Sequence, residues 1–150
     1  MQKNHLKSFD ELTKEDLYQI LRLRSDVFVV EQNCVYQDID NFDQKALHLF
    51  ISVNENIVAY TRLFNAGDYY KEASIGRVVV DIKYRKKKLG HLIIEKSIEA
   101  IRFHFKKSVI VVSAQLYLKD FYNSHKFIQK GEGYMEDGIP HIKMYLDARG

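Results

Sequence analysis

The segment from Ser74 to Gly90 constrains the fold more than any other part of the chain, because two structural patterns meet within it. It opens with an apolar, β-branched run that includes Ile75 and Val78–Val80. Such a run is too apolar for a strand with one face in water, so it predicts a central strand covered on both faces. The cationic run Arg85–Lys88 follows and leads into the second pattern.

The second pattern is an amphipathic helix. Apolar residues recur at spacings of three and four from Leu89, which predicts a helix that ends near Lys106. The cationic run therefore lies at the amino end of this helix, where the first N–H groups lack partners and the dipole is positive. Such a helix start can bind a pyrophosphate, and Lys86–Lys88 and His91 can add charge. A basic run alone is more often a solvated turn, but its position here favours a phosphate site.

The loop Arg85–Gly90 reads RKKKLG and resembles the acetyl-CoA loop of the GNAT acyltransferases, (Gln/Arg)-x-x-Gly-x-(Gly/Ala). Its first and last positions match the family motif. Lys88 stands where the family has its middle glycine, and a non-glycine residue held at positive φ costs roughly 1 kcal/mol or more. The resemblance implies that this loop binds CoA and that the backbone of the preceding strand holds the acetyl group and pantetheine arm.

Further similar blocks follow one another in the order found in the ElaA-like branch of this family. They are LRSDVFVVEQ (23–32), YQDID (36–40), HLF (48–50), AYTRL (59–63), SIGRVVV (74–80), SAQ (113–115) and EDGIPH (136–141). Each block is weak evidence alone, but their order together is specific. The resemblance implies the GNAT fold: an α/β protein with a mixed central sheet and flanking helices, in one domain of residues 1–150.

The remaining elements agree with a mixed α/β sheet. Thr13 resembles a cap for a helix that starts near Lys14, and apolar residues from Leu17 to Phe28 continue at helical spacing. The other expected elements are an antiparallel hairpin of strands 47–53 and 57–64, a strand at 108–114 parallel to that at 75–80, a short helix at 118–124, a segment at 127–130, a turn region at 131–140 and a final strand at 141–146.

The resemblance also suggests catalytic residues. The segment Tyr122–Phe127 reads YNSHKF and fits the Tyr-x-x-x-Gly-Phe segment of related enzymes, with Lys126 in place of glycine. Tyr122 is therefore the candidate general acid that protonates the departing CoA sulfur; packing beside Phe121 is the alternative. Gln115 stands seven residues earlier, where the family often has an asparagine. The residues expected to bind CoA are Val78, Val79, Val80, Arg85, Lys86, Lys87, Lys88, Leu89, Gly90, His91 and Gln115.

An attacking amine must be neutral, so a base or a water relay is needed. Among Glu31, Glu72, His48 and His141, the ElaA-like blocks favour Glu31 as the catalytic base and His141, with Asp137, as a substrate-binding residue. Each has an ordinary alternative: a surface carboxylate, a structural histidine, or an aspartate that closes a turn.

Composition narrows the function. The chain has 150 residues, a formal net charge of +3 and a single cysteine, Cys34, which excludes an intrachain disulfide and agrees with a reducing compartment. No apolar leader or 18-residue apolar run is visible, so we expect a cytoplasmic protein without a membrane contact. The motifs GxxxxGK, GxGxxG, HExxH and GxSxG are absent, and no metal site is expected.

The resemblance therefore implies an N-acetyltransferase that moves an acetyl group from acetyl-CoA, its cosubstrate, directly to an unidentified amine in a ternary complex. One alternative is a non-catalytic acyl-CoA-binding or regulatory module. A nucleic-acid-binding domain that uses 83–88 is a weaker alternative, because the positive charge is local. The acceptor and the oligomeric state stay open.

Overall fold

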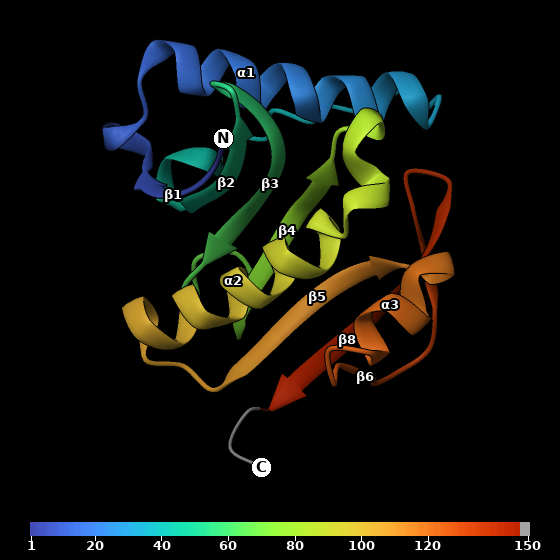
Figure 1. Ribbon diagram of the computed structural model, residues 1–150. Helices are drawn as coiled ribbons and strands as arrows, with labels where there is room; N and C mark the ends of the chain where they lie inside the picture. The colour runs from blue at the N-terminus through green and yellow to red at the C-terminus, as the bar shows by residue number, and fades with distance from the viewer. Residues whose placement is uncertain (148–150) are drawn as a thin grey trace.

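The computed structural model describes residues 1–147, which form a mixed sheet of eight strands with helices on both faces (Figure 1). The strands are β1 (Gln2–Ser8), β2 (Leu47–Val53), β3 (Asn56–Phe64), β4 (Ala73–Val80), β5 (Val109–Gln115), β6 (Ile128–Gln129), β7 (Tyr134–Glu136) and β8 (Ile139–Asp147). The helices are α1 (Lys14–Arg24), α2 (Leu89–Phe105) and α3 (Lys119–Asn123), and a π-helical segment, η2 (Ser25–Glu31), continues α1. Short 3-10 turns are η1 (Phe9–Glu11), η3 (Asp43–Lys45), η4 (Ile82–Lys87) and η5 (Leu116–Leu118).

The sheet has the order β1-β2-β3-β4-β5-β8-β6, and β7 pairs with β8. The first four strands form an antiparallel meander, β4 and β5 are parallel, and β5 and β8 are antiparallel. Parallel neighbours need a crossover, and α2 provides it between β4 and β5. The predicted hairpin, crossover helix and parallel strand pair are all confirmed.

Strand β4 lies at the centre of the sheet and contributes to two separate cores. Val79 packs with Ile20 and Leu23 of α1, whereas Ile75 belongs to the larger core that contains Ile93 and the rest of the apolar stripe of α2. The two helices therefore cover opposite faces, as the continuous apolar run of this strand predicted.

The start of α1 is confirmed, but its end differs from the prediction. Thr13 Oγ1 accepts a hydrogen bond from the Asp16 amide, and the Asp16 carboxylate accepts one from the Thr13 amide, which makes a reciprocal cap. After Arg24 the helix widens, and the Gln32 amide bonds to the Val27 carbonyl five residues earlier. Helical spacing alone does not reveal this change of pitch.

Two strands were missed. β1 is an edge strand of mostly polar residues, and β7 lies inside the predicted turn region 131–140. Each is held by backbone hydrogen bonds to a neighbouring strand and has no apolar pattern of its own, so neither could be predicted from hydrophobic spacing. No helix among residues 1–147 is long and apolar enough to cross a membrane.

The end of α3 fixes the position of Tyr122. The Phe127 amide bonds to the Tyr122 carbonyl at 3.1 Å and the Lys126 amide to the Asn123 carbonyl at 2.9 Å, which is a Schellman motif. The Phe127 and Tyr122 rings also pack together at a centroid distance of 5.8 Å. Lys126 has a φ of 72°, in the left-handed region that this motif usually gives to glycine.

We predict that Lys126→Gly stabilises the protein by about 1 kcal/mol, because glycine removes the steric cost of positive φ at this exposed position. Urea unfolding of both proteins measures the difference. Lys96→Gly, in the middle of α2, is the matched control and should lower the free energy of unfolding by about 1 kcal/mol. A less stable Lys126→Gly protein would contradict the prediction.

Candidate active site

The two parallel strands separate at the centre of the sheet. β4 pairs with β5 only through Ala73 and Ser74. Further along β4, Arg77 and Val78 together lie opposite the single residue Thr61 of β3, which is a β-bulge, and Arg77 has a φ of 49°. A bulge bends its strand and interrupts regular pairing. The backbone of β4 beyond the bulge therefore has no strand partner on the β5 side.

A cavity of ≈ 390 Å³ opens where β4 and β5 separate. Its walls come from the bulge of β4, the end of β5, Leu118 and Tyr122, the β7–β8 hairpin, and the chain from Phe28 to Asp40. A larger groove of ≈ 700 Å³ lies between β1, β2 and the start of α1, but none of the residues predicted to be functional lines it. The cavity beside the bulge is therefore the candidate active site.

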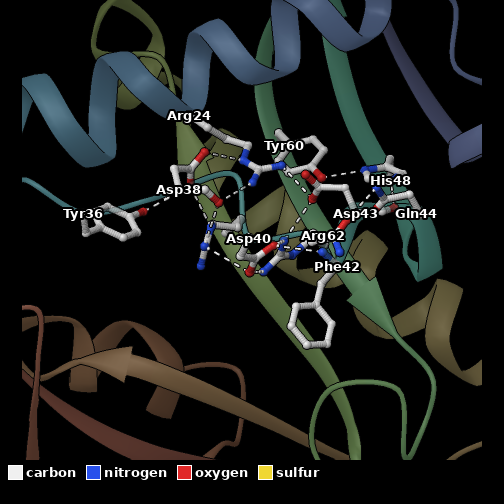
Figure 2. A network of polar contacts seen from close by, with 12 residues as sticks. Arg24, Tyr36, Asp38, Asp40, Phe42, Asp43, Gln44, His48, Tyr60 and Arg62 are labelled. Atoms are coloured by element: carbon white, nitrogen blue, oxygen red, sulfur yellow. Dashed lines mark hydrogen bonds and ion pairs between the residues drawn. The ribbon is translucent and has the colours of Figure 1, made fainter.

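Beside the bulge lies a network of three arginines and three aspartates, four of which are buried and two half-buried (Figure 2). Each aspartate bridges two arginines, at N–O distances from 2.7 to 3.3 Å. The members are Arg24 of α1, Arg62 of β3, Arg77 of the bulge, and Asp38, Asp40 and Asp43 from the segment after α1. Their formal charges cancel, which is the condition under which buried ions are tolerated.

The network holds the bulge and one wall of the cavity in place. Arg77 Nε donates to Asp38 at 2.7 Å, and its Nη2 lies 3.3 Å from Asp40. These contacts stabilise a residue with strained backbone, and they tie it to the segment that carries both aspartates. Since Asp40 and Arg77 both line the cavity, the network sets the shape of that wall.

The electrostatics of the network keep its members charged. Burial opposes ionisation of Asp43, but the guanidinium groups of Arg24 and Arg62 outweigh it and hold the pKa of Asp43 below its usual value. The pKa of Asp40 is lowered in the same way, against its burial, by Arg62 and Arg77. Both carboxylates are thus ionised at neutral pH.

His48 belongs to this structural region and not to the cavity. Its Nε2 donates to the Asp43 carbonyl at 2.9 Å, so its Nδ1 accepts from the Tyr60 hydroxyl at 2.6 Å. Burial lowers the pKa of His48, which keeps the ring neutral. Both ring nitrogens are occupied, and the residues that line the cavity do not include His48.

The cationic loop lies directly before α2, as the sequence predicted. Arg85 to Lys87 lie in the turn η4, Lys88 has a φ of 59°, and α2 begins at Leu89. Lys88 thus keeps the left-handed conformation expected of the glycine position. The amides of the first turn, Leu89 to His91, have no carbonyl within the helix to bond. Amides and ammonium groups together make this end of α2 suitable for a diphosphate.

Arg85 connects this loop to two other parts of the structure. It forms a bidentate ion pair with Glu31 at 2.6 and 2.8 Å, and its Nε donates to the Val80 carbonyl at 3.1 Å. The lining of the cavity does not include Glu31. Glu31 would therefore need to release Arg85 before it could accept a proton from an amine.

Tyr122 and Gln115 both line the cavity. The Tyr122 side chain comes from α3 and is only 4% exposed. Burial raises the pKa of Tyr122, so its hydroxyl stays protonated at neutral pH. The Gln115 amide oxygen accepts a hydrogen bond from Gln32 at 3.1 Å, which joins the end of β5 to the chain after α1.

The β7–β8 hairpin carries Asp137 and His141 to the opposite wall. His141 lies across from Gln115 in the pairing of β5 with β8. The Cys34 thiol donates to the Asp137 carbonyl at 3.3 Å and so helps to hold the hairpin. Val78, Gln115, Tyr122 and both hairpin residues, which are far apart in sequence, thus meet around one cavity.

The sequence did not reveal the arginine–aspartate network. Its signal was present, because Arg62 interrupts the apolar run of β3 and Arg77 that of β4. A charged residue inside a buried strand requires a partner of opposite charge. Which aspartates supply that charge depends on the path of the segment from 36 to 43, and no periodic pattern encodes this path.

Comparison with known proteins identifies similar chains. A family model described as an acetyltransferase (GNAT) domain matches residues 10–148. The protein ElaA of Escherichia coli is 42% identical over 136 residues, which cover 89% of each chain. The crystal structure of E. coli ElaA has a TM-score of 0.91 and covers 98% of this chain and 100% of that one, at 38% identity. An acyl-CoA N-acyltransferase from Pseudomonas aeruginosa gives a TM-score of 0.90 at 35% identity, covering 97% and 99% of the two chains.

We predict that Asp43→Asn lowers the free energy of unfolding by about 3–5 kcal/mol, because it leaves two buried arginines with one carboxylate too few. Asp26→Asn is the control: Asp26 is exposed and lies 4.0 Å from Arg22, so the loss should stay within about 0.5 kcal/mol. Urea unfolding at neutral pH measures both, and equal losses in the two variants would contradict the prediction.

The same network predicts how stability depends on pH. The pKa values of Asp40 and Asp43 are lowered in the folded state. Their contribution to the free energy of unfolding is therefore fully present above the pKa of about 4 that an aspartate has in the unfolded chain, and it is lost as the pH falls below that value. Unfolding free energies of the wild-type protein should therefore decrease from pH 5 to pH 2, and those of Asp43→Asn should decrease less.

Proposed function

Since this chain belongs to the GNAT acetyltransferase family, we propose that it is an N-acetyltransferase that moves the acetyl group of acetyl-CoA directly to an amine while both substrates are bound. The observation that carries this proposal is the cavity between the separated strands β4 and β5, which Tyr122 lines. The amino end of α2 follows β4 directly in the chain, through η4.

Acetyl-CoA fits this arrangement in two parts. The backbone of Val78–Val80 lacks a strand partner on the β5 side, and the two amides of a pantetheine arm can bond to it as an added strand would. The diphosphate then meets the free amides from Leu89 to His91, with Lys86–Lys88 around it. Gln115 lies at the end of β5, on the other side of the opening.

The backbone conformation of Lys88 and Lys126 supports a functional CoA-binding site. Lys88 and Lys126 have φ values of 59° and 72°, so each adopts the conformation for which the family uses glycine. A protein that had lost the site would not be expected to keep this strain at both positions.

In the reaction, the amine nitrogen attacks the thioester carbonyl carbon and the C–S bond breaks. Tyr122, whose hydroxyl is protonated at neutral pH, gives its proton to the departing sulfur. The Cys34 thiol donates a hydrogen bond to the Asp137 carbonyl, which supports direct transfer over an acyl-cysteine intermediate. Glu31 orients Arg85 for the phosphates and becomes available as a base only when Arg85 leaves it.

We predict that Tyr122→Phe lowers thiol release from acetyl-CoA by about 10²–10⁴-fold with a panel of primary amines, because the leaving thiolate loses its proton donor. Calorimetry should show acetyl-CoA binding within about twofold of wild type. Tyr117→Phe is the matched control, since Tyr117 is exposed on the adjacent turn η5. Unchanged turnover would remove Tyr122 from the mechanism. Binding of acetyl-CoA by the wild-type protein without turnover of any amine would favour the non-catalytic acyl-CoA-binding module.

A further inference from the structure

The β7–β8 hairpin supplies the cavity with an arrangement of groups that the binding of acetyl-CoA does not use. Glu136, Asp137 and His141 all come from it, and all three line the cavity. Resting on the proposed transfer reaction, we infer that this hairpin is the acceptor half of the site: its carboxylates attract a cationic alkylamine, and His141 removes the proton from the amine.

The charge balance of the cavity identifies the class of acceptor. Its charged lining residues are Arg77, Asp40, Glu136 and Asp137. Arg77 and Asp40 are neutralised within the buried network. Glu136 and Asp137 are left as an excess of negative charge at one wall, which attracts an ammonium group and repels a carboxylate.

The surroundings of His141 determine where its lone pair lies. Nδ1 is 2.7 Å from the Ile139 carbonyl oxygen, which cannot donate, so Nδ1 carries the hydrogen. In the neutral ring Nε2 is then free to accept a proton. Nε2 lies 3.5 Å from the Glu136 carboxylate, so the acceptor atom and this carboxylate are neighbours on the same hairpin.

Other groups around His141 complete its environment. The ring is 7% exposed, lies nearly parallel to the Tyr134 ring at a centroid distance of 6.0 Å, and stands opposite Gln115 of β5. Tyr134 shares a short hydrogen bond with the Ser113 hydroxyl. Glu136 is the charged partner of His141, and the Ile139 carbonyl and the Tyr134 ring are its neutral neighbours.

The other bases considered from sequence are less well placed. Both ring nitrogens of His48 are bonded, and Glu31 is paired with Arg85. Glu72 is not among the residues that line the cavity. His141 is the base that combines a position on the cavity wall with a free acceptor atom.

The proton balance is complete without a further reagent. His141 takes one proton from R–NH3⁺, and the R–NH2 nitrogen forms the C–N bond as the carbonyl π pair moves to oxygen. Collapse of this adduct breaks the C–S bond, and Tyr122 protonates the sulfur. The second proton leaves the nitrogen and restores Tyr122, while His141 gives its proton to water. The products are an amide, CoA thiol and one proton.

Acceptor charge is tested with acetyl-CoA and three amines of similar length: 1,3-diaminopropane, propylamine and β-alanine. We expect kcat/KM to fall in that order. At low salt the value for 1,3-diaminopropane should exceed that for β-alanine by roughly tenfold or more, and high salt should reduce this ratio. Glu136→Gln combined with Asp137→Asn should reduce this ratio to about threefold or less. Glu132→Gln, an exposed residue that does not line the cavity, is the control and should leave the ratio unchanged.

The role of His141 is tested by His141→Ala. We expect acetyl-CoA binding unchanged, kcat/KM with propylamine reduced by about 10²-fold or more, loss of the acidic limb of the pH profile, and partial recovery with added imidazole. A merely structural role would give neither the altered limb nor recovery. Glu31→Gln, assayed alongside, should keep the acidic limb.

The outcomes separate the two proposals. Failure of the wild-type protein to bind acetyl-CoA would overturn the proposed function itself. Binding with turnover, but with an unchanged amine ratio in the double variant, would overturn the acceptor class alone. An unaltered acidic limb in His141→Ala would overturn the assignment of the base.

Discussion

The charge balance between three arginines, two of them buried, and three aspartates is the constraint on which the candidate site depends. These ions come from α1, β3, β4 and the segment between α1 and β2, so a single network joins a helix, two central strands and a connecting segment to the cavity wall. Removal of any member leaves an uncompensated charge, and this dependence makes the conformation of the wall specific. The bulge at Arg77, which opens the sheet, is held by the same contacts.

Three of the residues with strained backbone lie on elements that border this opening or follow it. Arg77, Lys88 and Asp137 are non-glycine residues with φ between 49° and 59°, and they lie on the bulge, at the start of α2 and on the hairpin. Strain of this kind persists where neighbouring contacts enforce it. The Arg77 ion pairs and the bond from Cys34 to the Asp137 carbonyl are such contacts.

The sequence predicted the parts of the structure that depend on local pattern. The apolar run of β4 and the helical spacing of α2 placed the central strand, the crossover and the cationic loop. The RKKKLG motif placed Lys88 at the glycine position of the family, but it did not determine the backbone shape there. The sequence did not predict the π-helical turn after Arg24, which side-chain periodicity cannot distinguish from α-helix over seven residues. It also could not place Glu31 against Arg85 or His141 against Glu136, since these pairs form only when distant segments pack.

The two edge strands of the sheet, β1 and β6, differ in length and in composition. β1 exposes a full-length strand, but its sequence, QKNHLKS, carries two lysines and little apolar surface, and β6 at the other border spans only two residues. Charged or very short edge strands discourage the addition of a strand from another molecule. The unpaired edge of β4 beyond the bulge, in contrast, begins at the cavity, where a small molecule can reach its backbone groups.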